Sequence, residues 1–115
     1  MKKLLSLLLL CAWVAPAMAH TTLASATPKG GSELAASPSA IELKFAESAK
    51  LTSVVVVGED KQERRLEFVA GEQPLTFKVV NPNLTAGRNE VQWKALSHDG
   101  HVISGKLVYI VKPAK

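Results

Sequence analysis

Three residues far apart in the sequence, His20, Asp99 and His101, carry groups that bind divalent metal ions. His20 directly follows Ala17-Met18-Ala19, a small-residue pattern typical of signal-peptidase cleavage, so we expect it to become the first residue of a secreted chain. A histidine at that position offers one ion both a free α-amine and an imidazole. Together with a carboxylate and a second imidazole from segment 98–101, these ligands suit a tetragonal divalent copper ion.

The spacing within segment 98–101 favours a shared ion. Asp99 and His101 are two residues apart, and such residues point to the same face of an extended strand. Gly100 between them lets the backbone bend. On a regular strand His98 points the other way, so we interpret it as an exposed loop histidine; the alternatives are a third imidazole ligand or a residue that orients a ligand. Taken alone, the pair also fits a polar hairpin, and zinc remains chemically possible, although it favours tetrahedral sites.

Residues 1–19 have the features of a cleaved secretory signal peptide. Lys2 and Lys3 precede an apolar stretch, 4–14, that is shorter than the ~20 residues a membrane-spanning helix needs. The alternative is an uncleaved membrane anchor. Cys11 has no small residue beside it, so we interpret it as part of the discarded signal and not as a lipid attachment site. We therefore expect a secreted chain that is not embedded in a membrane.

The composition of residues 20–115 limits the metal ligands and the binding partners that this segment can have. This segment has no cysteine and no methionine, which excludes disulfides and the soft sulfur ligands that favour Cu(I). Without Lys2 and Lys3, the 14 basic and 10 acidic residues of the whole chain become 12 and 10, a net charge of +2. The basic residues are scattered along the sequence, so we expect no nucleic-acid partner. The length fits one domain.

Short apolar segments separated by Gly, Pro and Asn predict an all-β fold. In 90–96, Val91, Trp93 and Ala95 alternate with polar residues, which indicates a strand with one buried face and places Trp93 in the core. Tyr109 is expected at the edge of the core, with a position near the metal as the alternative. About seven strands suggest an antiparallel β-sandwich or a closed Greek-key barrel. The expected strands are 22–26, 40–46, 54–57, 65–69, 75–80, 90–96 and 106–111.

Two of the segments carry more specific expectations. The β-branched run Val54 to Val57 predicts a strand that is buried on both faces or covered by loops. Segment 33–36 can form a single turn of helix and no more.

At both ends, residues 20–115 resemble the CopC family of periplasmic copper proteins. The opening, 20–47, has the leading histidine, a Ser-x-x-Pro turn at 25–28, a Gly-Ser step at 31–32 and a Leu-x-Phe strand at 43–45. The closing part, 84–111, has Thr-Ala-Gly, Val-x-Trp, Ser-x-Asp-Gly-His and a later glycine, at 85–87, 91–93, 97–101 and 105. The middle, 51–83, is only generically similar.

The resemblance implies a seven-stranded Greek-key β-sandwich, immunoglobulin-like and cupredoxin-like in outline, for the copper-binding domain 20–115. It implies one Cu(II) per chain, held by His20, Asp99 and His101. Two departures stand out: residues 20–115 lack the methionines with which some members bind Cu(I), and Val102 replaces a proline that often follows the last histidine.

The resemblance further implies a non-enzymatic periplasmic protein in copper homeostasis and resistance. It would sequester cupric ion or carry it to an inner-membrane transporter of the CopD type. Two other classes remain open. A copper oxygenase also uses an N-terminal histidine, but it needs an open copper site on a broad substrate face, for which this chain has few aromatic residues. The other class is a metal-free β-sandwich interaction module.

Overall fold

The computed structural model describes residues 23–113, which form nine strands and no helix. The expected signal segment 1–19 and His20 lie outside these residues. Most neighbouring strands pair antiparallel, and only β2 and β9 pair parallel within the described range. The strands are β1 (Leu23–Thr27), β2 (Glu33–Leu34), β3 (Ala40–Phe45), β4 (Ala49–Val57), β5 (Glu63–Arg65), β6 (Glu67–Ala70), β7 (Thr76–Val80), β8 (Gly87–Ser97) and β9 (Val102–Val111).

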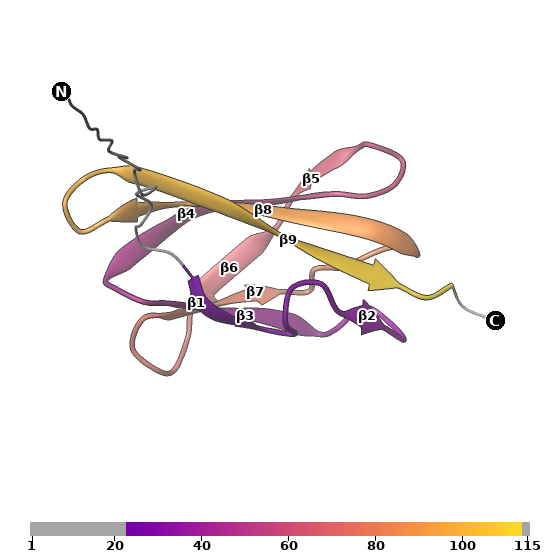
Figure 1. Ribbon diagram of the computed structural model, residues 1–115, viewed down its shortest axis with the longest axis horizontal. Coiled ribbons are helices and arrows are strands. Elements are labelled where there is room, and N and C mark those ends of the chain that lie inside the picture. The colour runs from indigo at the N-terminus through magenta and orange to yellow at the C-terminus, as the bar shows by residue number, and fades with distance from the viewer. Residues whose placement is uncertain (1–22, 114–115) are drawn as a thin grey trace, which may run out of the picture.

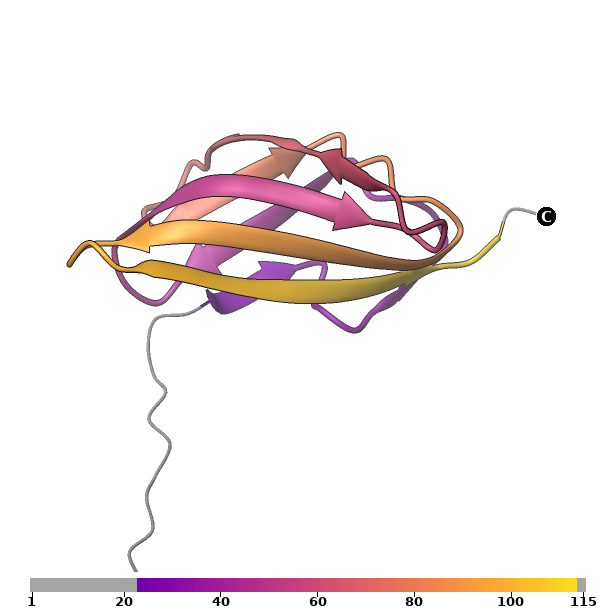
Figure 2. The same cartoon turned by 90° about the horizontal axis from the view of Figure 1, so that it is seen from above.

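The strands form two sheets that pack face to face, so the prediction of an all-β sandwich is confirmed (Figures 1 and 2). One sheet has the order β1-β3-β7-β6 and the other the order β2-β9-β8-β4-β5. The longest strands, β8 and β9, lie side by side in the five-stranded sheet and are joined by a short turn at one end of the molecule (Figure 1).

The core between the sheets is built from alternate residues, as the sequence pattern of 90–96 predicts. Val91, Trp93 and Ala95 of β8 are all buried. The Trp93 ring packs edge-on against Phe45 of the opposite sheet, with ring centroids 5.2 Å apart and an interplanar angle of 80°. On its other side the ring lies over Gly105 of β9, where a Cβ atom would come within 2.7 Å of it.

Three details differ from the prediction, and the first two account for the two additional strands. Segment 33–36 contains no helical turn; Glu33 and Leu34 form β2, which pairs with the end of β9. The predicted strand 65–69 is divided at Leu66, whose buried side chain marks the point where the chain passes from one sheet to the other.

The third difference is the run Val54 to Val57, which is buried on one face only. Val54 and Val56 are buried, whereas Val55 and Val57 are half-buried on the outer face of the five-stranded sheet. β-branched residues favour an extended backbone on either face of a sheet, so the run predicts the strand but not its burial.

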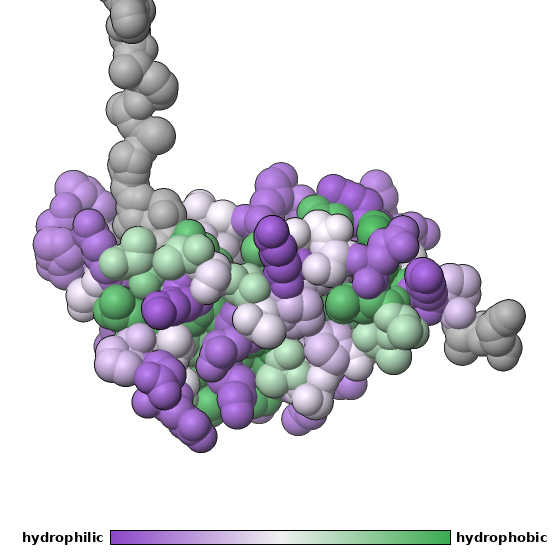
Figure 3. All heavy atoms as spheres, turned by 60° about the horizontal axis from the view of Figure 1, so that its bottom comes forward, coloured by the Kyte–Doolittle hydropathy of each residue, from purple (hydrophilic) through white to green (hydrophobic). Residues whose placement is uncertain are grey.

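Apolar and polar side chains are interspersed over the lower side of the molecule, on which β1, β3 and β7 lie, and they form no single broad apolar patch there (Figure 3). Within residues 23–113 there is no helix of the length and apolar character needed to cross a bilayer.

We predict that Gly105→Ala destabilises the fold by about 1–3 kcal/mol, because the added methyl group would overlap the Trp93 ring in a closely packed core. Urea unfolding of residues 20–115, followed by the fluorescence of their single tryptophan, measures the effect. Ser104→Ala, a change on the exposed neighbouring residue, should alter stability by less than about 0.5 kcal/mol. Equal stability of the two variants would contradict this account of the packing.

Candidate metal centre

Asp99 and His101, two of the three candidate ligands, lie at the end of the sandwich where β8 turns into β9. The last paired residues of this hairpin are Leu96 and Val102, so segment 97–101 forms the connection. Beside it runs the short link between β3 and β4. The two segments together enclose a shallow depression of about 420 Å³, lined by Glu47, Ser97, His98, Asp99, His101, Val102 and Ile103.

The structure brings Asp99 and His101 together, as predicted, but the local backbone conformation differs from the predicted one. The Nδ1 atom of His101 lies 3.2 Å from Oδ1 of Asp99. The two residues are in a tight turn and not on an extended strand: the amide of Gly100 donates to the Ser97 carbonyl (2.9 Å), and Gly100 has a φ of 89°. Glycine adopts this left-handed conformation without steric cost, so the turn rather than strand periodicity produces the pair.

Ser97 holds this turn and its carboxylate in place. Its hydroxyl donates a hydrogen bond to Oδ1 of Asp99, and the same hydroxyl accepts one from the His101 amide (3.2 Å). The Ser97 amide donates to the His101 carbonyl (2.8 Å), which closes the turn. The serine hydroxyl bond first, and then the His101 amide and imidazole, hold the pKa of the Asp99 carboxyl below its ordinary value. Asp99 is therefore an ionised, oriented acceptor.

The imidazole of His98 lies beside Glu47. Its Nε2 atom lies 3.8 Å from Oε1 of Glu47, and both side chains are largely exposed. This agrees with the interpretation of His98 as an exposed loop histidine. The sequence analysis missed Glu47 as a part of this site. Its place just after a predicted strand gives no sign that the sheets bring it beside a turn fifty residues later in the chain.

The described residues supply an incomplete ligand set. Within residues 23–113, no group of three or more His, Cys, Asp or Glu side chains is arranged to hold a metal ion. By themselves, Asp99 and His101 offer one oxygen and one nitrogen that are close enough to contact the same ion, because such ligands lie about 2 Å from a divalent transition metal. Any further protein ligand must approach from elsewhere.

His20 lies outside the described residues, but the start of β1 bears on where it could reach. Leu23 pairs with Phe45, two residues before Glu47 of the depression. Figures 1 and 2 both place the start of β1 in the half of the sandwich that is nearer the β8–β9 turn. Leu23 stands three residues after His20 in the sequence, and three residues of extended chain span about 10 Å.

Tyr109 takes no part in this site. Its ring is fully buried, and its hydroxyl donates a hydrogen bond to the Pro28 carbonyl. Burial raises the pKa of the phenol to about 12. It pairs with Asn89 near the other end of β9, and eight residues of strand separate it from His101 by about 26 Å. Tyr109 is therefore remote from the candidate ligands Asp99 and His101.

Comparisons with known proteins agree with this architecture. Residues 23–112 match the family model of the CopC domain. The chain is 37% identical over 106 residues to Copper resistance protein C of Pseudomonas syringae pv. tomato, covering 84% of this chain and 83% of the relative. It is 33% identical over 107 residues to Copper resistance protein C of Escherichia coli, covering 84% of each.

Two solved structures of similar proteins also align with most of this chain. The crystal structure of CopC from Methylosinus trichosporium OB3b aligns with a TM-score of 0.68 at 24% identity, covering 84% of this chain and 97% of that one. The crystal structure of PcoC, a methionine-rich copper resistance protein from Escherichia coli, aligns with a TM-score of 0.63 at 30% identity, covering 82% and 100%. The first of these supports the fold alone, and the second extends the likeness to the sequence.

We predict that Ser97→Ala raises the pKa of Asp99 toward its ordinary value, because the largest interaction favouring the ionised form is removed. In the native protein this carboxylate contributes stability above the ordinary aspartate pKa, and the contribution is lost as the pH falls through the lowered native value. Carbon-13 NMR of the Asp99 carboxyl during a pH titration of metal-free protein measures the change. Ser104→Ala is the matched control and should leave the value in place; an unaltered Asp99 pKa in the Ser97 variant would show that the hydroxyl bond has no such role.

Proposed function

The chain belongs to the CopC family, and we propose that its residues 20–115 form a periplasmic carrier that binds one Cu(II) ion. Membership of this family supports copper binding and copper resistance as the function. The oxidation state, the stoichiometry, the ligands and the compartment are our inferences. The observation that carries the ligand set is the convergence of Asp99 and His101 near the end of the sandwich toward which β1 begins. The compartment rests on the signal-peptide features of residues 1–19, and the oxidation state on the nitrogen and oxygen ligands.

In this proposal cleavage after Ala19 frees the His20 amine. The amine and imidazole of His20 then join Asp99 and His101 around the ion, giving three nitrogen ligands and one oxygen. Such a set suits the tetragonal geometry of Cu(II). An α-amine has a free pKa of about 7.7–8.0 and must lose its proton to bind, so copper affinity should fall as the pH is lowered.

The proposed protein ligands fill the coordination plane, which suits holding an ion more than activating a substrate. Catalytic metal sites usually keep one position open. The absence of methionine from residues 20–115 also separates this chain from its methionine-rich structural relative, because thioether sulfur is a ligand for Cu(I). We therefore propose a single-site cupric carrier and not an oxidoreductase.

The exposure of the proposed site supports transfer of the ion to another protein. Asp99 and His101 have side chains that are 55% and 79% exposed, so a recipient can approach the ligands directly. We propose delivery to an inner-membrane copper transporter of the CopD type, with sequestration of cupric ion as the simpler role of the same site.

We predict that His20→Ala, Asp99→Asn and His101→Ala each weaken Cu(II) binding by more than about 100-fold. Changes to groups that only orient a ligand already cost about 10–100-fold, and these variants remove a ligand itself. A Met-Ala extension before His20 should have a similar effect, because it moves the α-amine away. Copper titration followed by quenching of Trp93 fluorescence gives the stoichiometry and affinity, and electron paramagnetic resonance gives the ligand set.

His98→Ala is the matched control. It removes an imidazole from the same depression, but one that points toward Glu47, so it should leave the affinity within about threefold. If the extended protein or the His20 variant binds Cu(II) as tightly as the native chain, the proposed ligand set is wrong.

A further inference from the structure

The outer face of the five-stranded sheet is unusually basic near the candidate metal centre. Residues directly opposite one another in paired strands lie on the same face of a sheet, so the pairing defines rows across it. We call the three rows nearest the β8–β9 turn the hairpin face. Counted from the turn, the rows are Lys50, Leu96 and Val102, then Ser53, Lys94 and Ser104, then Arg65, Val55, Gln92 and Lys106.

The hairpin face contains four cationic residues and no carboxylate. The first acidic side chains on this side of the sheet, Glu63 and Glu90, stand one row further from the turn. Of the four cations, only Lys106 has an acidic partner within residues 23–113: its Nζ atom lies 3.1 Å from Oε2 of Glu90. Lys50, Arg65 and Lys94 form no ion pair with any described residue, so their charges are available to an external group.

The row beside the turn also exposes apolar surface. Val102 is 71% exposed and Leu96 is 39% exposed, and the two residues lie directly opposite each other. Leu96 immediately precedes Ser97, and Val102 immediately follows His101. A molecule that covers these two side chains therefore lies against the proposed ligands.

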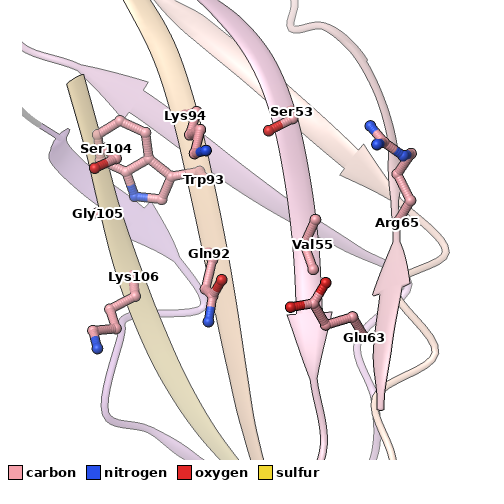
Figure 4. Close-up of a pocket in the computed structure, with 10 residues that line it drawn as sticks. All are labelled: Ser53, Val55, Glu63, Arg65, Gln92, Trp93, Lys94, Ser104, Gly105 and Lys106. Atoms are coloured by element: carbon pink, nitrogen blue, oxygen red, sulfur yellow. The ribbon is translucent and has the colours of Figure 1, made fainter. Parts of the chain in front are cut away.

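Further from the turn, the hairpin face is hollowed. A shallow depression of about 630 Å³ lies over β9, β8, β4 and β5, and Figure 4 shows the side chains that line it. Lys94, Arg65 and Lys106 stand around Ser53, Ser104 and Gln92, all of which can donate hydrogen bonds. One carboxylate, Glu63, also lines the hollow, in the row next to Arg65 and further from the turn, so the cations outnumber the acidic groups three to one. A hollow of this kind can receive a protruding chain segment, whereas the flat surface of a lipid bilayer would leave it unfilled.

We propose that the hairpin face docks an acidic segment of the protein that exchanges copper with this chain. Carboxylates of the partner contact Lys50, Arg65 and Lys94, and an apolar side chain covers Leu96 and Val102. Complementary charge mainly speeds the encounter and sets its orientation, while the apolar contact slows dissociation. The inference rests on the proposed copper carrier, because it assigns the face from which the ion is transferred.

The test uses nitrogen-15 NMR of metal-free residues 20–115, titrated with a capped hexapeptide of four glutamates and two leucines. We expect shifts of amides in β4, β8 and β9 along the hairpin face, and little binding of the counterpart in which lysine replaces glutamate. Binding should weaken as the ionic strength rises from about 0.01 to about 0.15 M, which shortens the Debye length from about 30 to about 8 Å. Shifts confined to the other sheet, or equal binding of both peptides, would refute the proposal.

Matched variants distinguish binding at the hairpin face from a general effect of the protein's net charge. Arg65→Glu with Lys94→Glu should weaken binding of the glutamate peptide about tenfold. Lys29→Glu with Lys44→Glu changes the net charge equally at exposed sites off the hairpin face and should have little effect. Val102→Ser should weaken binding of the glutamate peptide about fivefold. Val69→Ser, which changes a 52% exposed valine of the other sheet, should not measurably alter this binding. Equal losses within either pair would overturn the proposal.

Two further measurements distinguish the remaining outcomes. Vesicles of phosphatidylglycerol are tested against the same variants; binding of vesicles, but not of peptide, through Arg65 and Lys94 would replace the protein partner with a lipid surface and overturn the proposal. Copper titration of the Arg65→Glu, Lys94→Glu protein should give the native affinity. If this double variant binds copper with the native affinity and also binds the peptide as the native protein does, the docking proposal is refuted and the proposed carrier role is unaffected.

Discussion

The packing of β8 and β9 against the opposite sheet is the constraint on which the rest of the structure depends. Trp93 is buried against Phe45, and Gly105 leaves room for its ring on the other side. A slip of one residue in the pairing of these strands would turn every inward side chain of the slipped strand toward solvent. The core therefore sets the register, and the register ends the hairpin at Leu96 and Val102, leaving segment 97–101 to form the turn.

Because the turn is exposed, its geometry comes from local hydrogen bonds and not from burial. Ser97 binds the Asp99 carboxylate, accepts from the His101 amide and, through its own amide, closes the hairpin. An exposed but oriented pair is suited to an ion that must be taken up and released. Strands β4, β5, β8 and β9 carry the cations of the hairpin face, so the register of their pairing also sets the position of that face relative to the proposed ligands.

Much of the fold could be predicted from local patterns, because alternation and β-branched runs act over a few residues. The strands at 40–46 and 90–96 and the burial of Trp93 are confirmed. The errors arise where the partner of a segment decides its state. Glu33 and Leu34 form a strand because β9 offers them hydrogen bonds, and the predicted strand 65–69 divides because its two parts join different sheets. Neither partner is visible in a short window of sequence.

In the candidate site, too, some features follow from residue types and others from strand pairing. Residue types alone set the chemistry available to this protein: a histidine at residue 20, the Asp-x-His pair, and no sulfur ligand in residues 20–115. The pairing of distant strands places Glu47 beside His98, starts β1 in the half of the sandwich nearer the hairpin turn, and keeps Tyr109 remote from that turn. The physical reason is that residue type fixes what a side chain can bind, whereas strand pairing between distant segments fixes what it can meet.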